Sequence, residues 1–322
     1  MYFNKSNSFY HGIMFHHFHD DNIHAKIQGS ISKDDFYKII CFIGRENILD
    51  ADIFFDKYKK NKLKENEVCI TFDDALKCQI DIALPVLEDL KIKSFFFVYT
   101  SIFEENPDTL EIFRHFRNVY FNSVDDFYLS FYKVLNKDLS GFFRKNEKKI
   151  SDTMIKFPFY STEDVKFRLI RDNFLTKVDY DKIIILMMDE KKIKPKDLLP
   201  ILFFSKKDLK SLNKLGHLIG LHSHNHPTLL EKLSYDEQKN EYEKCISIIS
   251  KILDEPSNNI NCMSHPNGSY NDDTLNILEN LGIELGFKQI MQIEPQKGMK
   301  NINNSHLEIA REDHSNILIR AT

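Results

Sequence analysis

Short apolar runs that alternate with amphipathic, helix-like stretches constrain the fold of this chain more than any other feature. The runs read as strands, and the stretches between them show helical periodicity. A strand–helix–strand order builds parallel sheets, because the helix carries the chain back to the start of the next strand. We therefore expect an α/β fold with a parallel sheet or barrel. The predicted strands cover residues 12–15, 68–72, 94–99, 218–221 and 262–265, with a strand running into a loop over 306–314, and the predicted helices begin near Ser32 and cover 80–90, 207–215, 235–253 and 272–281.

Two adjacent carboxylates, Asp73 and Asp74, directly follow the apolar run 68–72. Charged groups at the end of a buried strand need a partner, and a metal ion suits an acidic pair. We expect only one of the two carboxylates to bind a metal, so the other can take a proton from a water molecule. The division we predict is Asp74 as the ligand and Asp73 as the base.

Two histidines, His222 and His226, stand four residues apart after the apolar run 218–221. Two imidazole nitrogens and one carboxylate form a recurrent hydrolytic site for zinc or a similar divalent cation, with positions left for water and substrate. The bound cation lowers the pKa of its water, to about 7 in zinc enzymes. We predict that Asp74, His222 and His226 form one such site, and that His224 faces the opposite side.

The middle of the chain, from about residue 104 to residue 202, differs from the rest. It has many charged and aromatic residues and a single glycine, Gly141. Amphipathic stretches such as 124–135 and 165–175 predict helices, and a structureless loop of this length is improbable in a compact domain. We expect residues 1–103 and 203–322 to form the main domain, and residues 104–202 to be a mainly helical insertion that shapes the mouth of the active site.

Charge and cysteine content set the expected partners and location. The formal net charge of -4 gives no reason to expect nucleic acid as a partner. No apolar run is long enough to span a bilayer. The five cysteines form no C-x-x-C pair, which predicts buried free thiols in a reducing compartment. The first residues lack the pattern of a signal peptide, so we expect a cytoplasmic enzyme.

Three motifs resemble those of the polysaccharide deacetylase family, also called the NodB-homology family or carbohydrate esterase family 4. They are Thr-Phe-Asp-Asp at 71–74, His-Ser-x-x-His at 222–226, and Ser-His-Pro-Asn-Gly-Ser-Tyr-Asn at 264–271, and they occur in the order of the family. The segment 86–97 also resembles the family sequence that follows the Asp pair. The resemblance covers about residues 10–103 and 203–315 and leaves the middle unmatched.

The resemblance implies a distorted (β/α) barrel of the NodB deacetylase type, with a divalent metal on Asp74, His222 and His226. It also implies that Asp73 is the base and that the backbone N–H of Asn267 donates to the oxyanion. The expected metal is Zn2+, with Co2+, Ni2+ or Mn2+ as alternatives. Family members remove N-acetyl, or sometimes other acyl groups, from amino sugars.

Three departures from the family pattern change the expected site. Ser264 occupies the position of the usual arginine, as in a subset of the family, and Arg311 can replace the contact of that arginine with the base. Asn267 stands where the family has an aromatic residue, which removes a stacking surface for sugar. No clear Leu-x-His motif supplies the usual general acid near the C-terminus. A histidine that ends the first strand lies at the site in the relevant subgroup, so we expect His16 to be the acid, with two alternatives, His314 and His17.

These observations predict a metal-dependent hydrolase that removes an N-acetyl or N-formyl group from an amino sugar. The missing export signal and the insertion favour a nucleotide-linked or lipid-linked sugar, used in surface polysaccharide, O-antigen or lipopolysaccharide biosynthesis. The alternative is a catalytically degenerate sugar-binding protein on a deacetylase scaffold, which the missing aromatic residue and acid motif favour. Intact Asp73 argues against that alternative, because binding alone does not need the base.

Overall fold

The chain divides into two compact units. The computed structural model describes residues 2–4, 7–105, 107–156, 160–291, 303 and 305–321. The first unit consists of Met1–Asp108 and Pro200–Thr322, and the second is Thr109–Leu199. The boundaries expected from the sequence were residues 103 and 203. Among the described residues, no helix combines the length and the apolar character that crossing a membrane requires.

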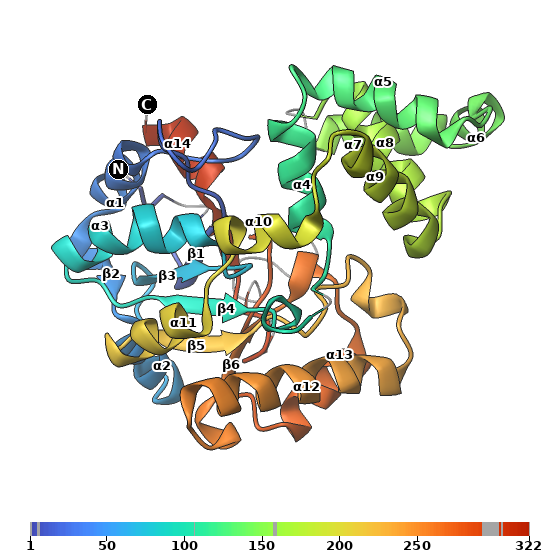
Figure 1. The fold of residues 1–322 in the computed structure, drawn as a ribbon. Coiled ribbons are helices and arrows are strands. Elements are labelled where there is room, and N and C mark those ends of the chain that lie inside the picture. Colours follow the sequence, from blue (N-terminus) through green and yellow to red (C-terminus); the bar gives the residue numbers. More distant parts are fainter. Residues whose placement is uncertain are drawn as a thin grey trace. The chain divides into compact units, whose positions relative to one another are not determined.

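A parallel sheet forms the centre of the first unit (Figure 1). It is eight-stranded, with the order β7-β6-β5-β4-β3-β1-β8 and with β2 beside β3. Strands β7 and β8 are the two ends of this order. Between them, Ile309 N donates to Gly286 O, and Lys288 N donates to Ile309 O, both at 2.9 Å. The sheet is therefore a nearly closed barrel, which confirms the predicted fold class. The strands are β1 (His11–Phe15), β2 (Ile48–Leu49), β3 (Val68–Phe72), β4 (Phe95–Val98), β5 (Leu218–Leu221), β6 (Cys262–Ser264), β7 (Leu285–Phe287) and β8 (Arg311–Asp313).

Helices follow most of the strands, and several begin at caps that the sequence encodes. Ser32, Ser205 and Ser234 each accept a hydrogen bond from the third residue of the helix that follows, and complete a capping box with it. The predicted loop after the last strand is wrong, because the chain enters a helix directly at His314. The helices of this unit are α1 (Lys33–Ile43), α2 (Ala51–Lys59), α3 (Leu84–Asp89), α11 (Lys206–Lys214), α12 (Tyr235–Leu253), α13 (Asp272–Asn280) and α14 (His314–Ala321), and α10 (Pro195–Leu202) spans the boundary.

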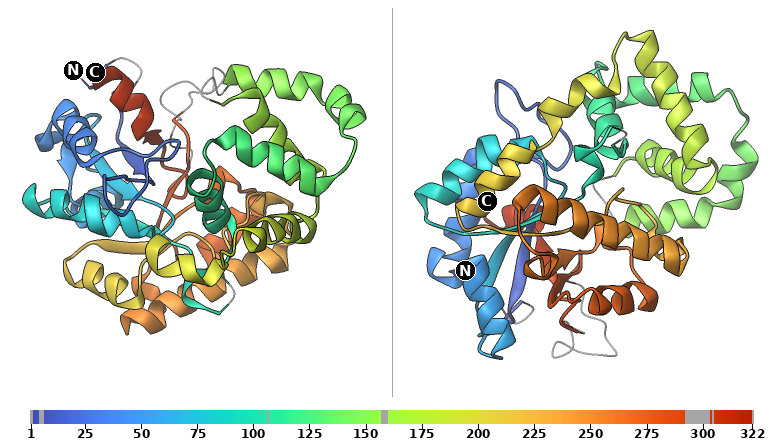
Figure 2. Two further views of the ribbon diagram at one scale, coloured as in Figure 1. Left: turned by 45° about the horizontal axis from the view of Figure 1, so that its top comes forward. Right: turned by 60° about the horizontal axis from the view of Figure 1, so that its bottom comes forward.

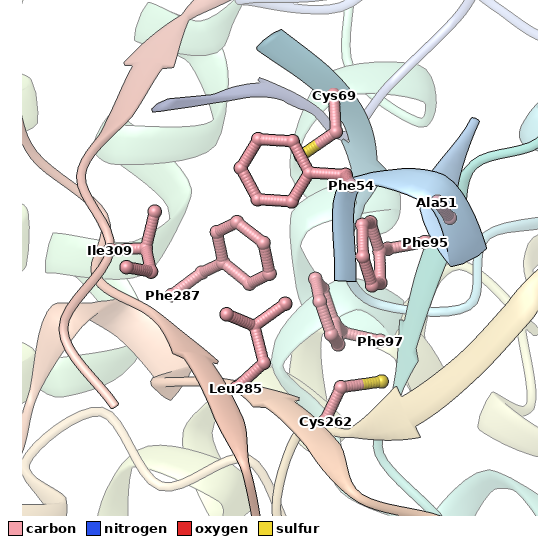
Figure 3. Packing of buried hydrophobic residues seen from close by; sticks show 9 residues of the cluster. All are labelled: Ala51, Phe54, Cys69, Phe95, Phe97, Cys262, Leu285, Phe287 and Ile309. Carbon is pink, nitrogen blue, oxygen red and sulfur yellow. The ribbon is translucent and has the colours of Figure 1, made fainter. Parts of the chain in front are cut away.

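An apolar cluster fills the end of the barrel at which the strands begin (Figure 3). Helix α2 covers this end, since Ala51 N donates to Lys93 O just before β4. Two cysteines belong to the cluster, and Cys78 and Cys245 are also buried. Cys41 is exposed, so the expectation of buried thiols is wrong for this residue. The cluster consists of Ala51, Phe54, Cys69, Phe95, Phe97, Cys262, Leu285, Phe287 and Ile309.

The inward-facing side chains become polar toward the other end of the barrel. Side chains alternate between the two faces of a strand, so Cys69 in the apolar cluster is followed on the same face by Thr71 and then by Asp73. Ile309 is followed in the same way by Arg311. Gly12 makes room for this arginine, because a Cβ atom on Gly12 would lie 2.9 Å from Arg311 Cγ. The alternation thus leads from the core to a polar site at the carboxyl ends of the strands.

The second unit is a helical bundle, in which α5, α8 and α9 pack against one another (Figure 2). Its core contains the rings of Phe127, Phe131, Phe167 and Tyr180, with the Phe131 and Phe167 ring centroids 5.0 Å apart. The role expected for this segment at the active-site mouth stays a prediction. Its helices are α4 (Leu110–Val119), α5 (Val124–Leu135), α6 (Ser140–Lys145), α7 (Glu147–Lys156), α8 (Thr162–Asn173) and α9 (Lys177–Glu190).

Candidate metal centre

Three side chains meet at the carboxyl ends of β3 and β5: Asp74, His222 and His226. Asp74 Oδ1 lies 3.1 Å from His226 Nε2 and 3.4 Å from His222 Nε2. The two Nε2 atoms are 3.2 Å apart. All three residues are buried, and one ligand atom of each lies within 4.8 Å of the other two. The structure thus brings together the three residues that the sequence singled out as metal ligands.

The donor atoms of this group fit a divalent cation. His222 Nδ1 donates a hydrogen bond of 2.8 Å to the carbonyl of Ser264, which leaves the lone pair of Nε2 directed at the cluster. Asp74 Oδ1 is buried and forms no ordinary hydrogen bond within the described residues. Burial by itself would raise the pKa of the Asp74 carboxyl, but His226 and His222 outweigh burial and hold that pKa well below its usual value. An ionised carboxylate beside two imidazoles is a donor set that zinc and similar metals bind.

Left-handed backbone conformations shape both loops that carry these ligands. Asp74 has a φ of +74°, Ser223 of +63° and His226 of +51°. Neighbouring residues of a strand point to opposite faces, but the turn at Asp74 breaks this alternation. As a result, both Asp73 and Asp74 approach His222, with carboxylate oxygens 4.0 and 3.4 Å from its Nε2. Such conformations cost energy in residues other than glycine and are concentrated at functional sites.

Asp73 is paired with Arg311, which comes from β8 on the other side of β1. The guanidinium donates to both carboxylate oxygens, each at 2.7 Å. It also donates to Ser264 Oγ at 2.7 Å, and the Ser264 hydroxyl donates to Asp73 Oδ2 at 3.2 Å. Burial is the largest single influence and raises the pKa of the Asp73 carboxyl, but the charge and hydrogen bonds of Arg311, together with His222 and His16, outweigh it and leave that pKa lowered. Asp73 is therefore ionised at neutral pH and can accept a proton.

Of the three acid candidates, His16 is the one with a described contact to this carboxylate. Its Nε2 lies 3.7 Å from Asp73 Oδ2, and its side chain is 20% exposed. His314 instead turns both ring nitrogens to backbone carbonyls, of Met14 at 3.2 Å and of Gly29 at 3.0 Å. His17 is buried. The geometry therefore favours His16 over His314 for transfer of a proton to a substrate.

Asn267 lies in a turn directly after β6, on the edge that carries the ligands. The turn includes Pro266–Gly268, and Asn267 has a left-handed conformation with φ +53°. His265, the residue just before this turn, is buried and stacks on Tyr270 with ring centroids 4.0 Å apart. Asn267 itself is exposed. Asn267 follows Ser264, whose carbonyl contacts His222, by three residues, and its role as the backbone donor to the oxyanion stays a prediction.

A buried acid that the sequence analysis missed supports the loop of the two histidines. Glu241 of α12 accepts hydrogen bonds from the backbone N–H groups of His224 and Asn225, at 2.9 and 2.7 Å. His224 points away from the ligands, with Nδ1 2.9 Å from Thr100 Oγ1. No local sequence signal marks Glu241, because it lies far along a regular amphipathic helix.

Comparisons with known proteins point to one family. The family profile described as "Polysaccharide deacetylase" matches residues 60–115 and 180–286, about half of the chain. A search of curated proteins finds no match.

Several solved structures share the fold. The deacetylase PplD of Streptococcus pyogenes in complex with acetate has 17% sequence identity and a TM-score of 0.54, over 97% of each chain. IcaB from Ammonifex degensii has 12% identity and a TM-score of 0.55, over 98% of this chain and 97% of that one. A de-N-acetylase from Aggregatibacter actinomycetemcomitans has 11% identity and a TM-score of 0.55, over 97% of this chain and 99% of that one. From the family match, the chain belongs to the polysaccharide deacetylase family, whose members are hydrolases that act on amide C–N bonds.

Proposed function

We propose that this protein is a zinc-dependent N-deacylase that removes an acyl group from an amino sugar. The observation that carries the proposal is the buried cluster of Asp74, His222 and His226 beside an ionised Asp73. The names of two similar structures, a deacetylase with acetate and a de-N-acetylase, support N-acetyl as the acyl group. A nucleotide or lipid linkage of the sugar, a role in surface polysaccharide biosynthesis and a cytoplasmic location are predictions from the sequence.

The residues divide the work between binding and proton transfer. Asp74, His222 and His226 would hold a divalent cation, which when bound would act as a Lewis acid toward an amide carbonyl and lower the pKa of a water molecule. Asp73 takes the proton from the attacking water at Oδ2, the oxygen that faces both His222 and His16. Arg311 and Ser264 fix the plane of this carboxylate through three hydrogen bonds, and a fourth joins Arg311 to Ser264. A charged base that cannot rotate is pre-organised for one direction of proton transfer.

His16 then donates a proton to the nitrogen of the leaving amine. Its ring is partly exposed, so a substrate can approach it, whereas Asp73 is buried behind it. The amide bond breaks to give a carboxylic acid and the free amino sugar. The Asn267 N–H is the donor we assign to the developing oxyanion, because such donors stabilise charge that forms only in the transition state.

An amine-release screen tests this function. The full-length protein, loaded with zinc, is incubated with N-acetyl and N-formyl nucleotide sugars, with lipid-linked sugars, and with chitin and peptidoglycan. We expect amine release from an activated sugar, and its loss in Asp73→Asn at unchanged zinc content. Activity on long polymers alone would overturn the small-substrate assignment. A protein that holds no metal, or that binds zinc and releases no amine from any substrate, would support the sugar-binding alternative.

A further inference from the structure

Gln79 is a fully buried polar residue beside the site that has no part in the mechanism above. It has 0% exposure and begins a π-helical turn, η2 (Gln79–Ala83), that precedes α3. Single π-helical turns in helices frequently occur at functional sites, because they redirect a side chain that a regular helix would point elsewhere. The helix predicted from the sequence, over residues 80–90, begins one residue later than this turn, and Gln79 was given no role.

The side chain of Gln79 links two backbone carbonyls on different strands. Its Nε2 donates to Asp73 O at 2.6 Å and to His16 O at 3.0 Å. The regular pairing of β1 with β3 ends at Phe15 and Phe72. Both carbonyls therefore belong to the first residue beyond the ladder on each strand. Asp73 N donates a backbone hydrogen bond to Phe15 O at 3.2 Å, and Gln79 continues the link between the two strand ends just beyond this bond.

The chemistry of the partners fixes the orientation of this amide. Carbonyl oxygens only accept hydrogen bonds, so the NH2 group must face both of them, and its two hydrogens are used by these two partners. Gln79 Oε1 is buried and forms no hydrogen bond within the part of the chain that the structure describes. A buried acceptor without a hydrogen bond is unfavourable. The orientation of the amide therefore satisfies the two carbonyls and leaves the oxygen of Gln79 itself unsatisfied.

We propose that Gln79 is a positioning residue that holds His16 and Asp73, the proposed acid and base, at a fixed separation. This role rests on the function proposed above. Gln79 donates hydrogen bonds to the backbone of both residues, and no hydrogen bond to either of their side chains is described, so it acts through their placement. It has no described contact with Asp74, His222 or His226, and we therefore expect it to leave metal binding unaffected.

Loss of the amide should change turnover more than binding. In Gln79→Met, a side chain of similar length has no donor, and the ends of β1 and β3 can move apart. Small misplacements of catalytic groups reduce rates by up to about 100-fold, and an interaction needed only in the transition state lowers kcat without raising KM. We expect kcat to fall about 10- to 100-fold, with KM and the zinc Kd each within about twofold.

A control separates positioning from general stability. Gln238 is also fully buried, and its Nε2 donates to Leu233 O at 3.0 Å, away from the acid and base. Gln238→Met should lower the thermal midpoint at least as much as Gln79→Met while keeping kcat within about twofold of the wild type. Gln79→Asn keeps the amide but cannot reach both carbonyls, so its kcat should lie between those of the wild type and Gln79→Met. This variant replaces Gln79→Met in the test if the methionine variant does not fold.

A crystal structure of the zinc-loaded variant provides a readout that does not need activity. The separation of His16 Nε2 and Asp73 Oδ2, 3.7 Å in the wild type, should increase in Gln79→Met or Gln79→Asn. An unchanged separation overturns the positioning role, even if no substrate is found. With an active wild type, unchanged kcat in both Gln79 variants also overturns it, as does an equal loss of kcat in Gln238→Met. A wild type without amine release counts against the proposed function alone.

Discussion

Replacement of Arg311 by methionine should leave a buried carboxylate without its counter-ion. The Arg311 side chain is 0% exposed and that of Asp73 is 2% exposed. Besides the two contacts with Asp73, the guanidinium donates to the carbonyl of Lys288 at 3.0 Å and to Thr71 Oγ1 at 3.3 Å. Methionine fills a similar volume but offers none of these hydrogen bonds, so the variant isolates the charge and its donors.

Two estimates of the cost agree. Two unit charges about 4 Å apart interact by about 4 kcal/mol at an effective dielectric constant of about 20. Removal of one partner from a buried ion pair costs about 3–5 kcal/mol in proteins. We therefore expect Arg311→Met to lower the free energy of unfolding of the barrel by about 3–5 kcal/mol at pH 7. Protonation of Asp73 relieves part of this cost, so the loss should be smaller at pH 5.

The assay must report on the barrel alone, because a chain of two units need not unfold in one step. Hydrogen exchange of backbone amides in β1 and β3, followed in metal-free protein at increasing urea, meets this need. Arg45→Met is a matched control. Its guanidinium donates to the carbonyls of Ile48, Leu90 and Lys91, and its loss should cost less than about 2 kcal/mol.

A double-mutant cycle completes the test. Asp73→Asn together with Arg311→Met removes both charges, so the two losses should be non-additive by about 2 kcal/mol or more. Two results would refute the view that this buried pair stabilises the barrel. One is a decrease of less than about 1 kcal/mol in the free energy of unfolding of Arg311→Met, and the other is additive decreases in the double mutant.

Three further predictions concern the metal, the base and the histidines of the fold. His226→Ala should reduce zinc content and amine release together, and zinc added to chelated wild type should restore both; full activity in the metal-free protein would contradict this. Asp73→Asn should retain zinc and lose about 100-fold or more in kcat, and an active variant would exclude Asp73 as the base. Burial lowers the pKa of His11 and of His217 to about 4 and that of His265 to about 3. Between pH 6.5 and these values the unfolded chain therefore binds more protons than the folded one. The free energy of unfolding should fall by about 1.4 kcal/mol for each of these histidines and each pH unit below 6.5. Urea midpoints that do not change from pH 7 to pH 5 would show that these rings are charged when folded.

Local sequence patterns predicted several elements of both units well. Strand β5 begins and ends where the apolar run 218–221 does, and α12 and α5 match their predicted ranges. Apolar periodicity and serine caps act over a few residues, so they can be recognised without knowledge of the fold. The short strands β2 and β7 were missed, because two or three residues show no periodicity.

The sequence by itself determined which residues could bind a metal, since Asp73, Asp74, His222 and His226 stand in recognisable spacings at the ends of predicted strands. Tertiary structure decided how these groups are held. Arg311 reaches Asp73 only because the barrel brings β8 next to β1, Gln79 faces two strand ends only through a π-helical turn, and Glu241 supports the histidine loop from a distant helix. Ligand identity depends on side-chain chemistry, which the sequence states directly. Orientation and pKa depend on burial and on partners that are remote in sequence, and these exist only once the barrel has closed.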